Sequence, residues 1–558
     1  MFEPKFFTTI KDYDKKTFLS DATSGLIVGI VALPLAIAFA IASGVPPQMG
    51  LITAIIGGFF ISFLGGSRVQ IGGPSGALIV VIYGVVNQHG LEAVFVVSIM
   101  AGIMLLIMGL LRAGTLIQFM PYPIVVGFTS GIALIIFSSQ MKEFFGLPDG
   151  DIPADLVSRW SYYFDHIDQI SFPAFGIGFL TVMITLSWPY LTRKIPGSLV
   201  AIVITTILVG SLGLPVATIG SQFGVIDTSF QMPMLPGLNL QLIQELLVPA
   251  FTIAMLVSIE SLLSAIVADG ATGYRHRPNT ELISHGIANM ITPLFGGMAA
   301  SGALAKTMTN VRNGGKTPVA GMIHALVLML VLLYLGKLAQ LIPMAALAGV
   351  LVVVAYNMSE WRSFRSILRS SKSDMSVLLS TFLLTVFVGL NVALPFGIIL
   401  ALILFVRRVM ETSEIDVLKD AVEDELSHIS DETELLEIPK GVEVFQIKGP
   451  FFFGLANKFE EAEKEIHEKP KVRIIRMRRV PFIDSTGLKN LRSFYERSLK
   501  HDTHTILSGV TEKTLEALKK DGLYYIIGSE NICETIEHAM IRAKEVLYEK
   551  QNGSGRKD

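Results

Sequence analysis

Two stretches of this sequence decide its fold: Gly72-Gly73-Pro74-Ser75-Gly76-Ala77-Leu78, and Gly296-Gly297-Met298-Ala299-Ala300-Ser301-Gly302-Ala303-Leu304. Both read GG…SGAL, and each interrupts an apolar region with glycine. Lipid cannot satisfy free backbone N–H and C=O groups, so such breaks occur inside a membrane only where they line a cavity or are buried in protein. Matching broken helices in two halves indicate an inverted-repeat transporter with its site between them. The alternative interpretation is close helix packing through small residues.

The composition agrees with a membrane protein. The chain has 558 residues, 51% hydrophobic and 16% charged, and its mean hydropathy is +0.57. Residues 1–410 hold 22 Lys and Arg and 18 Asp and Glu. The shorter tail, 411–558, holds 23 Lys and Arg and 29 Asp and Glu, so the charged residues are concentrated there. These values exclude a disordered chain and an ordinary soluble enzyme. Cys533 is the only cysteine, which excludes a disulfide framework and a zinc site built on several thiolates, and the net charge of −2 indicates no nucleic-acid partner.

Apolar runs long enough to span a membrane recur before residue 410. Eleven are expected, at 24–43, 47–64, 92–111, 120–139, 172–191, 197–213, 246–267, 317–335, 342–356, 375–391 and 392–406. Three glycine-broken stretches lie between them, at 68–87, 280–296 and 299–313. We therefore expect a polytopic α-helical membrane protein with fourteen transmembrane segments, seven in each half.

Lys and Arg are unevenly distributed among the predicted loops. They follow crossings 4, 6, 8, 10 and 12, at Arg112, Arg193 and Lys194, Arg275 and Arg277, Arg312 and Lys316, and Arg362, Arg365, Arg369 and Lys372. Of the alternate loops, 214–245 has none, and 148–171 has five Asp and one Arg. The positive-inside rule then predicts that both termini are cytoplasmic. We expect the protein to be a multi-pass protein of the cell (inner) membrane. We expect no cleavable signal in the first 20 residues.

The broken segments predict an anion site. Half-helices that begin near Ser75 and Ser301 would direct free backbone N–H groups, and the positive ends of their dipoles, at the middle of the membrane. Ser75 and Ser301 would cap these helices or donate to the ligand. Lys306, close to the second start, would add positive charge. The alternative for Lys306 is that it snorkels to the interface or forms a structural pair.

Glu260 is the one ionisable residue between Glu245 and Asp269. Carboxylates in membrane spans are functional candidates. Its apolar surroundings favour the protonated form of Glu260, whereas a nearby Lys306 would favour the ionised form. This competition suits a proton-coupled cycle. Ser264, on the same helix face, would donate a hydrogen bond or help to hold a cation. The alternative is a structural ion pair.

The tail alternates strands and helices. We expect strands at 442–447, 472–477 and 505–507, helices at 457–468 and 511–520, and a further helix opened by Asp484 or Ser485 as its cap. The predicted organisation is a cytoplasmic N-terminal segment 1–20, a transmembrane domain 21–410, an acidic linker 411–440, a small α/β domain 441–550 and a disordered tail 551–558. The tail shows no catalytic constellation, so we expect no enzyme activity and no cofactor.

The chain resembles the SulP family of anion transporters, which includes prestin. The resemblance rests on GGSRVQIGGPSGA (65–77), IESLLSAIVADGATG (259–273), ELISHGIAN (281–289), FGG (295–297) and NVRNGGKTP (310–318). The tail resembles a STAS domain through Asp484-Ser485-Thr486-Gly487. The resemblance implies a seven-plus-seven inverted repeat, a core domain that moves against a gate domain, a homodimer, and a small inorganic or organic anion as substrate.

The resemblance also implies site residues. The family's anion site corresponds to Phe39, Ser75, Gly76, Ala77, Gly302, Ala303, Leu304, Ala305 and Lys306, with Lys306 where many relatives have arginine. Glu260 matches the family's acidic coupling residue. In signalling STAS domains the loop serine can be phosphorylated, so Ser485 or Thr486 is a regulatory candidate, with a helix cap as the alternative. A cytosolic partner of this domain is a further expectation.

Family members differ in their coupling ion. The sodium-dependent cyanobacterial bicarbonate transporter has Asp, Thr and Thr where this chain has Glu260, Ser264 and Leu304. The IESLL, DG-x-TG and NVR runs are more similar to a bacterial proton-coupled C4-dicarboxylate transporter. We therefore predict a secondary active, proton-coupled transporter of sulfate, bicarbonate or C4-dicarboxylate that works by alternating access. The alternatives are a sodium-coupled bicarbonate transporter, a nucleobase permease of the same fold and a membrane-anchored STAS signalling protein.

Overall fold

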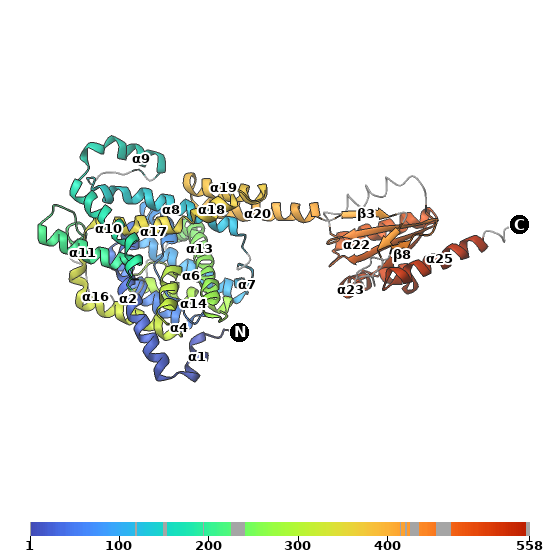
Figure 1. Cartoon of the computed structure of the whole chain (residues 1–558), viewed down its shortest axis with the longest axis horizontal. Helices are drawn as coiled ribbons and strands as arrows, with labels where there is room; N and C mark the ends of the chain where they lie inside the picture. Colours follow the sequence, from blue (N-terminus) through green and yellow to red (C-terminus); the bar gives the residue numbers. More distant parts are fainter. Residues whose placement is uncertain are drawn as a thin grey trace. The chain divides into compact units, whose positions relative to one another are not determined.

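The computed structural model of the chain forms two units, Met1–Ala401 and Leu402–Asp558 (Figure 1). The structure describes residues 2–117, 120–148, 153, 155–192, 195–224, 240–412, 414–418, 421–423, 435–452 and 470–553. The first unit is helical, and the second contains a β-sheet.

The longer helices of the first unit overlap the predicted apolar runs and glycine-broken stretches, whereas five of the short ones lie outside them. The longer ones are α2 (Lys15–Ala42), α6 (Leu91–Leu110), α8 (Tyr122–Phe145), α10 (Phe172–Leu191), α11 (Gly197–Leu212), α13 (Leu240–Thr272), α14 (Pro278–Ile291), α16 (Pro318–Ala339), α17 (Met344–Met358), α19 (Lys372–Phe387) and α20 (Leu390–Thr412). The shorter ones are α1 (Lys5–Thr9), α3 (Pro47–Ile52), α4 (Gly58–Leu64), α5 (Ile79–His89), α7 (Gly114–Ile117), α9 (Leu156–Asp165), α12 (Ile219–Phe223), α15 (Leu304–Arg312) and α18 (Trp361–Ile367). Every predicted run overlaps at least one of them.

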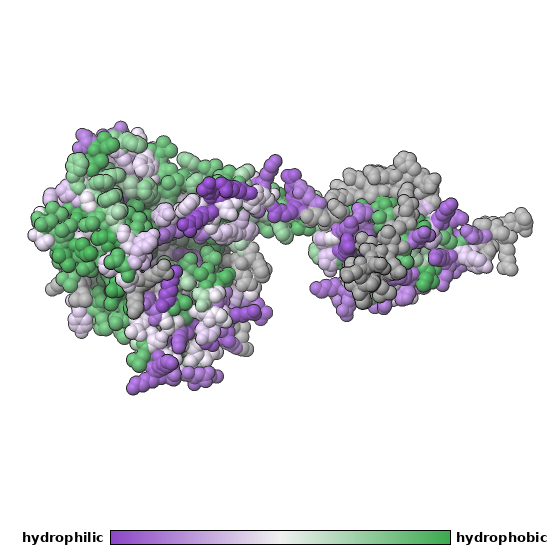
Figure 2. All heavy atoms as spheres, in the orientation of Figure 1, coloured by the Kyte–Doolittle hydropathy of each residue, from purple (hydrophilic) through white to green (hydrophobic). Residues whose placement is uncertain are grey.

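Many of these helices have the length and composition of membrane spans. Within the described ranges eight qualify: Lys15–Ala42, Pro47–Leu64, Leu91–Leu110, Tyr122–Phe145, Phe172–Leu191, Leu240–Thr272, Met344–Ile367 and Val392–Glu411. Three apolar helices are shorter, at Gly76–His89, Gly197–Leu212 and Pro318–Tyr334. Figure 2 shows apolar residues over α10, α11 and α16, and polar residues at α1. The unit therefore has the apolar surface that a multi-pass membrane protein needs.

The helices pack mainly in two groups. In the first group α6 packs on α14 and α13, α16 on α2 and α4, and α15 on α13 and α2. In the second group α8 packs on α17 and α19, and α10 on α11 and α17. Gly102 of α6 and Gly286 of α14 allow close approach, because a Cβ on either would lie 2.8 Å from the other's carbonyl oxygen. Fewer contacts join the two groups to each other.

A buried carboxylate fixes the loop that leads into the first broken segment. Glu281 of α14 is fully buried, and its Oε2 accepts hydrogen bonds from the backbone N–H groups of Gly66 at 2.6 Å and Ser67 at 2.8 Å. Buried N–H groups without a partner are costly, so this carboxylate holds the loop in place.

Glu281→Ala is therefore expected to destabilise the first unit by roughly 3 kcal/mol, because it leaves two buried donors unpaired. The measurement is the midpoint of thermal unfolding of the purified full chain in detergent. Glu92→Ala, at an exposed position in the first turn of α6, is the matched control and should change the midpoint little. An unchanged midpoint for Glu281→Ala would show that the loop is held by other contacts.

The second unit has a five-stranded sheet of order β3-β6-β7-β8-β9. Its strands are β3 (Glu414–Leu418), β6 (Val442–Lys448), β7 (Val472–Arg479), β8 (His504–Ser508) and β9 (Ile532–Cys533); β3 is antiparallel to β6, and the other pairs are parallel. Two further strands, β4 (Ala421–Glu423) and β5 (Leu435–Glu437), pair with each other. The helices are α22 (Ser485–Lys500), α23 (Glu512–Asp521), α24 (Leu523–Ile527) and α25 (Ile536–Gly553).

Helices cover both faces of this sheet. Phe445 packs with Phe494 of α22 in one buried cluster, whereas Val444 packs with Ala539 of α25 in another. Neighbouring residues of one strand thus enter opposite cores, as alternation requires. The three predicted strands and the helices at 485 and 511 are confirmed. The predicted helix 457–468 lies outside the described residues.

The segment 411–440 differs from the expected linker, because β3 lies within it at the sheet edge. Ile415 and Val417 pack against the core, while Asp416 forms an ion pair with Lys448 at 2.6 Å. The acidic composition of the whole segment hides this short alternation of apolar and charged residues. Of the predicted tail 551–558, the first three residues belong to α25, and 554–558 lie outside the described residues.

Candidate functional site

The two GG…SGAL segments meet in the structure. Strand β1 (Gly72–Gly73) pairs antiparallel with β2 (Ser301–Gly302), so that Gly72 lies opposite Gly302 and Gly73 opposite Ser301. The backbone N–H of Ala303 also donates to the carbonyl of Ile71 at 3.0 Å. Part of the polar backbone of each break is therefore satisfied by the partner segment inside an apolar unit.

A helix starts immediately after each strand. A 3₁₀ turn, Gly76–Leu78, leads into α5, and α15 begins at Leu304. Because the strands are antiparallel, the chain leaves them in opposite directions and both helices have their N-termini beside the ladder. The N-cap residues, Ser75 and Ala303, make no side-chain hydrogen bond to their helices. The positive ends of the two helix dipoles are therefore not capped by these side chains.

Both serines of the repeated motif donate to one carboxylate. The hydroxyl groups of Ser75 and Ser301 each lie 2.7 Å from Oε2 of Glu260, and both serines are buried. Ser75 therefore does not cap its helix with its side chain, as one predicted alternative had it, and the role of both serines as ligand donors stays a prediction. The physical reason is that a carboxylate surrounded by apolar residues needs hydrogen-bond donors, and these two hydroxyls supply them.

The helix that carries Glu260 also fixes both broken segments. In α13, the Ser261 hydroxyl accepts from the N–H of Gly302 at 2.9 Å, and its carbonyl accepts from Nε2 of Gln70 at 3.0 Å. Ser264 donates to the Thr307 hydroxyl at 3.2 Å. Sequence reasoning missed Gln70 and Thr307; the available signal was their polarity beside the glycine-broken segments.

Lys306 reaches from α15 to the other broken segment. Its side chain is buried, and Nζ lies 3.3 Å from the carbonyl oxygen of Pro74. A Cβ on Gly73, whose φ is +148°, would lie only 3.0 Å from Nζ. The predicted alternative in which Lys306 snorkels to the interface is therefore wrong, whereas the alternative of a structural pair stays open.

Phe39 lies beside the start of the first half-helix. A Cβ on Gly76 would be 3.7 Å from Cε1 of Phe39 in α2 and 2.8 Å from Sδ of Met358 in α17. Met358 belongs to the second helix group, and no pattern in the sequence singled it out. Of the remaining predicted residues, Ala77, Gly302 and Ala303 are buried, whereas Leu304 and Ala305 are exposed.

The regulatory candidates lie in the first turn of α22. Ser485 and Thr486 are both exposed. The N-cap of this helix is Asp484, whose Oδ1 accepts from the N–H of Gly487 at 2.7 Å. Neither hydroxyl is therefore needed for the cap, and their modification stays a prediction.

Comparisons with known proteins cover both units. Residues 18–381 match the Sulfate permease family, and residues 435–539 match the STAS domain. "Putative sulfate transporter YvdB" of Bacillus subtilis (strain 168) is 37% identical over 530 residues, which are 94% of this chain and 98% of that protein. "Bicarbonate transporter BicA" of a Synechocystis species is 30% identical over 537 residues, 93% of each chain.

Solved structures share the fold. The murine Solute Carrier 26 family member A9 (Slc26a9) anion transporter in the inward-facing state matches with a TM-score of 0.84 at 19% identity, over 96% of this chain and 93% of that chain. The transmembrane domain of a cyanobacterial bicarbonate transporter BicA matches with a TM-score of 0.61 at 30% identity, over 70% of this chain and 98% of that chain.

Proposed function

We propose that this chain, which belongs to the Sulfate permease family and carries a STAS domain, is a secondary active, proton-coupled transporter of a small anion. The carrying observation is the β1–β2 ladder, with the N-termini of α5 and α15 on either side of it and Lys306 beside it. Sulfate and bicarbonate transporters among its relatives support the anion class, and C4-dicarboxylates remain within the proposed range. Phe39, Ser75, Gly76, Ala77 and residues 301–306 form the proposed binding site.

The charges of the site favour an anion. Each helix N-terminus contributes roughly half a positive charge, and Lys306 adds a full one. An ionised Glu260 subtracts one, so the site carries a net charge of about +1 with Glu260 ionised and about +2 with it protonated. Anion and proton therefore increase each other's affinity, which favours the doubly loaded carrier that a symport cycle moves.

The hydrogen bonds of Glu260 provide a second link between proton and anion. While Glu260 is ionised, its Oε2 holds the hydroxyls of Ser75 and Ser301. A protonated carboxyl is a weaker acceptor, so protonation releases two donors beside the helix N-termini. We propose that these hydroxyls then turn to the anion. Sodium is the alternative coupling ion.

Alternating access requires two bodies that move against each other. We propose that the helix group containing α6, α13 and α14 is one body and that the group containing α8 and α17 is the other. The proposal is supported by the scarcity of contacts between the groups and by Met358, which approaches Gly76 from the second group. We further propose that the first unit is a fourteen-span inverted repeat in the inner membrane, with both termini in the cytoplasm. The protein forms a homodimer and is regulated through its STAS domain.

Transport by the purified full chain in proteoliposomes tests the function. With an inward proton gradient, we expect at least one of labelled sulfate, bicarbonate, fumarate, succinate or chloride to accumulate above its equilibrium level, and labelled uracil not to enter. Accumulation that depends on a sodium gradient instead of a proton gradient would make sodium the coupling ion. Entry of uracil alone would favour a nucleobase permease, and absence of any flux would favour a membrane-anchored signalling protein.

A further inference from the structure

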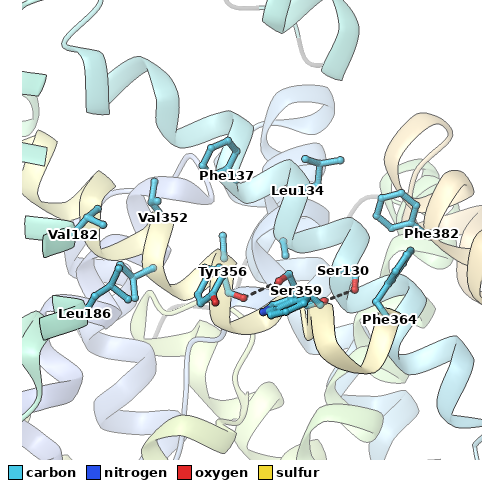
Figure 3. Close-up of a pocket in the computed structure, with 14 residues that line it drawn as sticks. Ser130, Leu134, Phe137, Val182, Leu186, Val352, Tyr356, Ser359, Phe364 and Phe382 are labelled. Carbon is cyan, nitrogen blue, oxygen red and sulfur yellow. Dashed lines mark hydrogen bonds between the residues drawn. The ribbon is translucent and has the colours of Figure 1, made fainter. Parts of the chain in front are cut away.

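A cavity lies within the first unit, apart from the residues of the β1–β2 site. It has a volume of about 520 Å³ and is formed by α8, α10, α17, α18 and α19 (Figure 3). Leu134, Phe137, Val182, Leu186 and Val352 contribute apolar side chains to its wall. The size is that of a small-molecule site, but the wall is more apolar than an anion would require.

The two serine hydroxyls in this wall are already occupied. Ser130 donates to the carbonyl of Ser359 at 2.6 Å, and Ser359 donates to the carbonyl of Tyr356 at 2.7 Å (Figure 3). The serine hydrogens therefore point to the protein's own backbone. A hydrocarbon chain can fill such a cavity without leaving these serine hydroxyls unsatisfied.

One end of the cavity adjoins a cluster of positive charges. Trp361 and Phe364 of α18 line the cavity, while Arg362 and Arg365 of the same short helix are exposed. The guanidinium of Arg362 lies 5.7 Å from the centroid of the Trp361 ring. Aromatic residues with neighbouring arginines are typical of the boundary between hydrocarbon and headgroups.

These charges lack acidic partners. Arg369 and Lys372 extend the cluster, and the four basic side chains form no ion pair with the residues that the structure describes. The nearby carboxylates bond elsewhere: Glu360 accepts from the Tyr122 hydroxyl at 3.0 Å, and Asp374 accepts from the Ser371 hydroxyl at 2.8 Å. The cluster is therefore open to an external anionic group.

We propose that this cavity holds an acyl chain of an anionic membrane phospholipid, whose headgroup phosphate is bound by the Arg362–Arg365 end of α18. An apolar cavity beside unpaired cations matches the two parts of such a lipid, and basic residues at a membrane surface attract anionic headgroups. The lipid would lie between α8, α10 and α17, within the second helix group. This inference does not depend on which anion is transported.

Native mass spectrometry of the purified full chain tests headgroup recognition. Delipidated protein is titrated with phosphatidylglycerol or phosphatidylcholine of the same acyl composition. We expect the first phosphatidylglycerol to bind more tightly, and its affinity to fall roughly fivefold for each arginine removed in Arg362→Gln/Arg365→Gln. Lys11→Gln/Lys15→Gln, which removes two exposed charges at the N-terminus, is the matched control and should retain the preference.

A second variant tests the cavity itself. Val352→Phe adds volume to the wall and should displace the bound lipid while leaving the arginines in place. Equal affinity of the wild-type chain for both headgroups would overturn the assignment of the headgroup. Unchanged phosphatidylglycerol binding by both variants would overturn the site. Binding that survives Val352→Phe but is lost with the arginines would leave only a surface charge effect and would also overturn the cavity as the acyl-chain site.

Discussion

Lys306→Met is expected to weaken binding of the transported anion by roughly 100-fold. The ammonium is buried beside the Pro74 carbonyl, within reach of both broken segments. Losing one charged partner of a desolvated interaction costs about 3 kcal/mol, which corresponds to this factor. Lys306→Arg keeps the positive charge and should retain most of the affinity. The measurement is calorimetric titration of the purified chain with the anion that gives uptake.

The experiment separates anion binding from folding. Methionine fills a similar volume without charge, and Glu260 keeps its two hydroxyl partners and can take up a proton, so Lys306→Met should remain folded. Its thermal midpoint reports this directly. Lys316→Met is the control, because its side chain is exposed and only its backbone N–H bonds to Asp21. Wild-type affinity in Lys306→Met would remove this lysine from the site and leave the helix N-termini to bind the anion alone.

The main features of the site could be predicted because they are local. The GG…SGAL repeat revealed the two breaks, and the isolation of Glu260 in an apolar run marked it without knowledge of its neighbours. Each signal depends on the cost of polar groups in lipid, which is the same wherever the chain folds. The helices followed from the apolar runs for the same reason.

The pairing of side chains could not be predicted, because it depends on contacts between distant segments. Glu260 bonds to serines separated from it by 185 and 41 residues, and nothing in the sequence predicts that both hydroxyls donate to the same carboxylate oxygen. Met358 approaches Gly76 from another helix group. Phe39 is one of 34 phenylalanines, and only resemblance to a family distinguished it.

Which side chains of α15 are exposed also depends on contacts between distant segments and could not be predicted. Leu304 and Ala305 directly precede the buried Lys306, yet both are exposed. A helix presents successive residues in directions about 100° apart, so a run of family-matched residues cannot all face one ligand. If the anion binds at the N-terminus of α15, these residues contribute backbone N–H groups more than side chains.

Glu260→Gln is expected to abolish accumulation driven by a proton gradient while preserving exchange of the anion. Glutamine keeps the size of the side chain and one oxygen that can accept from Ser75 and Ser301, but it cannot gain or lose a proton. One coupled proton supports about tenfold accumulation for each pH unit of gradient. The variant should therefore reach a ratio of about one in proteoliposomes in which the wild type accumulates the anion.

Two measurements on the same vesicles make this result specific. Exchange of labelled for unlabelled anion without a gradient requires binding and movement of the carrier but no net proton transfer, so it should stay within a few-fold of wild type. Glu245→Gln, on the same helix at an exposed position near His89, should keep full accumulation. Loss of both exchange and accumulation in Glu260→Gln would assign Glu260 to the binding geometry instead of the proton. Full accumulation by Glu260→Gln would exclude Glu260 as the coupling residue, because glutamine cannot carry a proton and the coupled proton would then have to bind elsewhere.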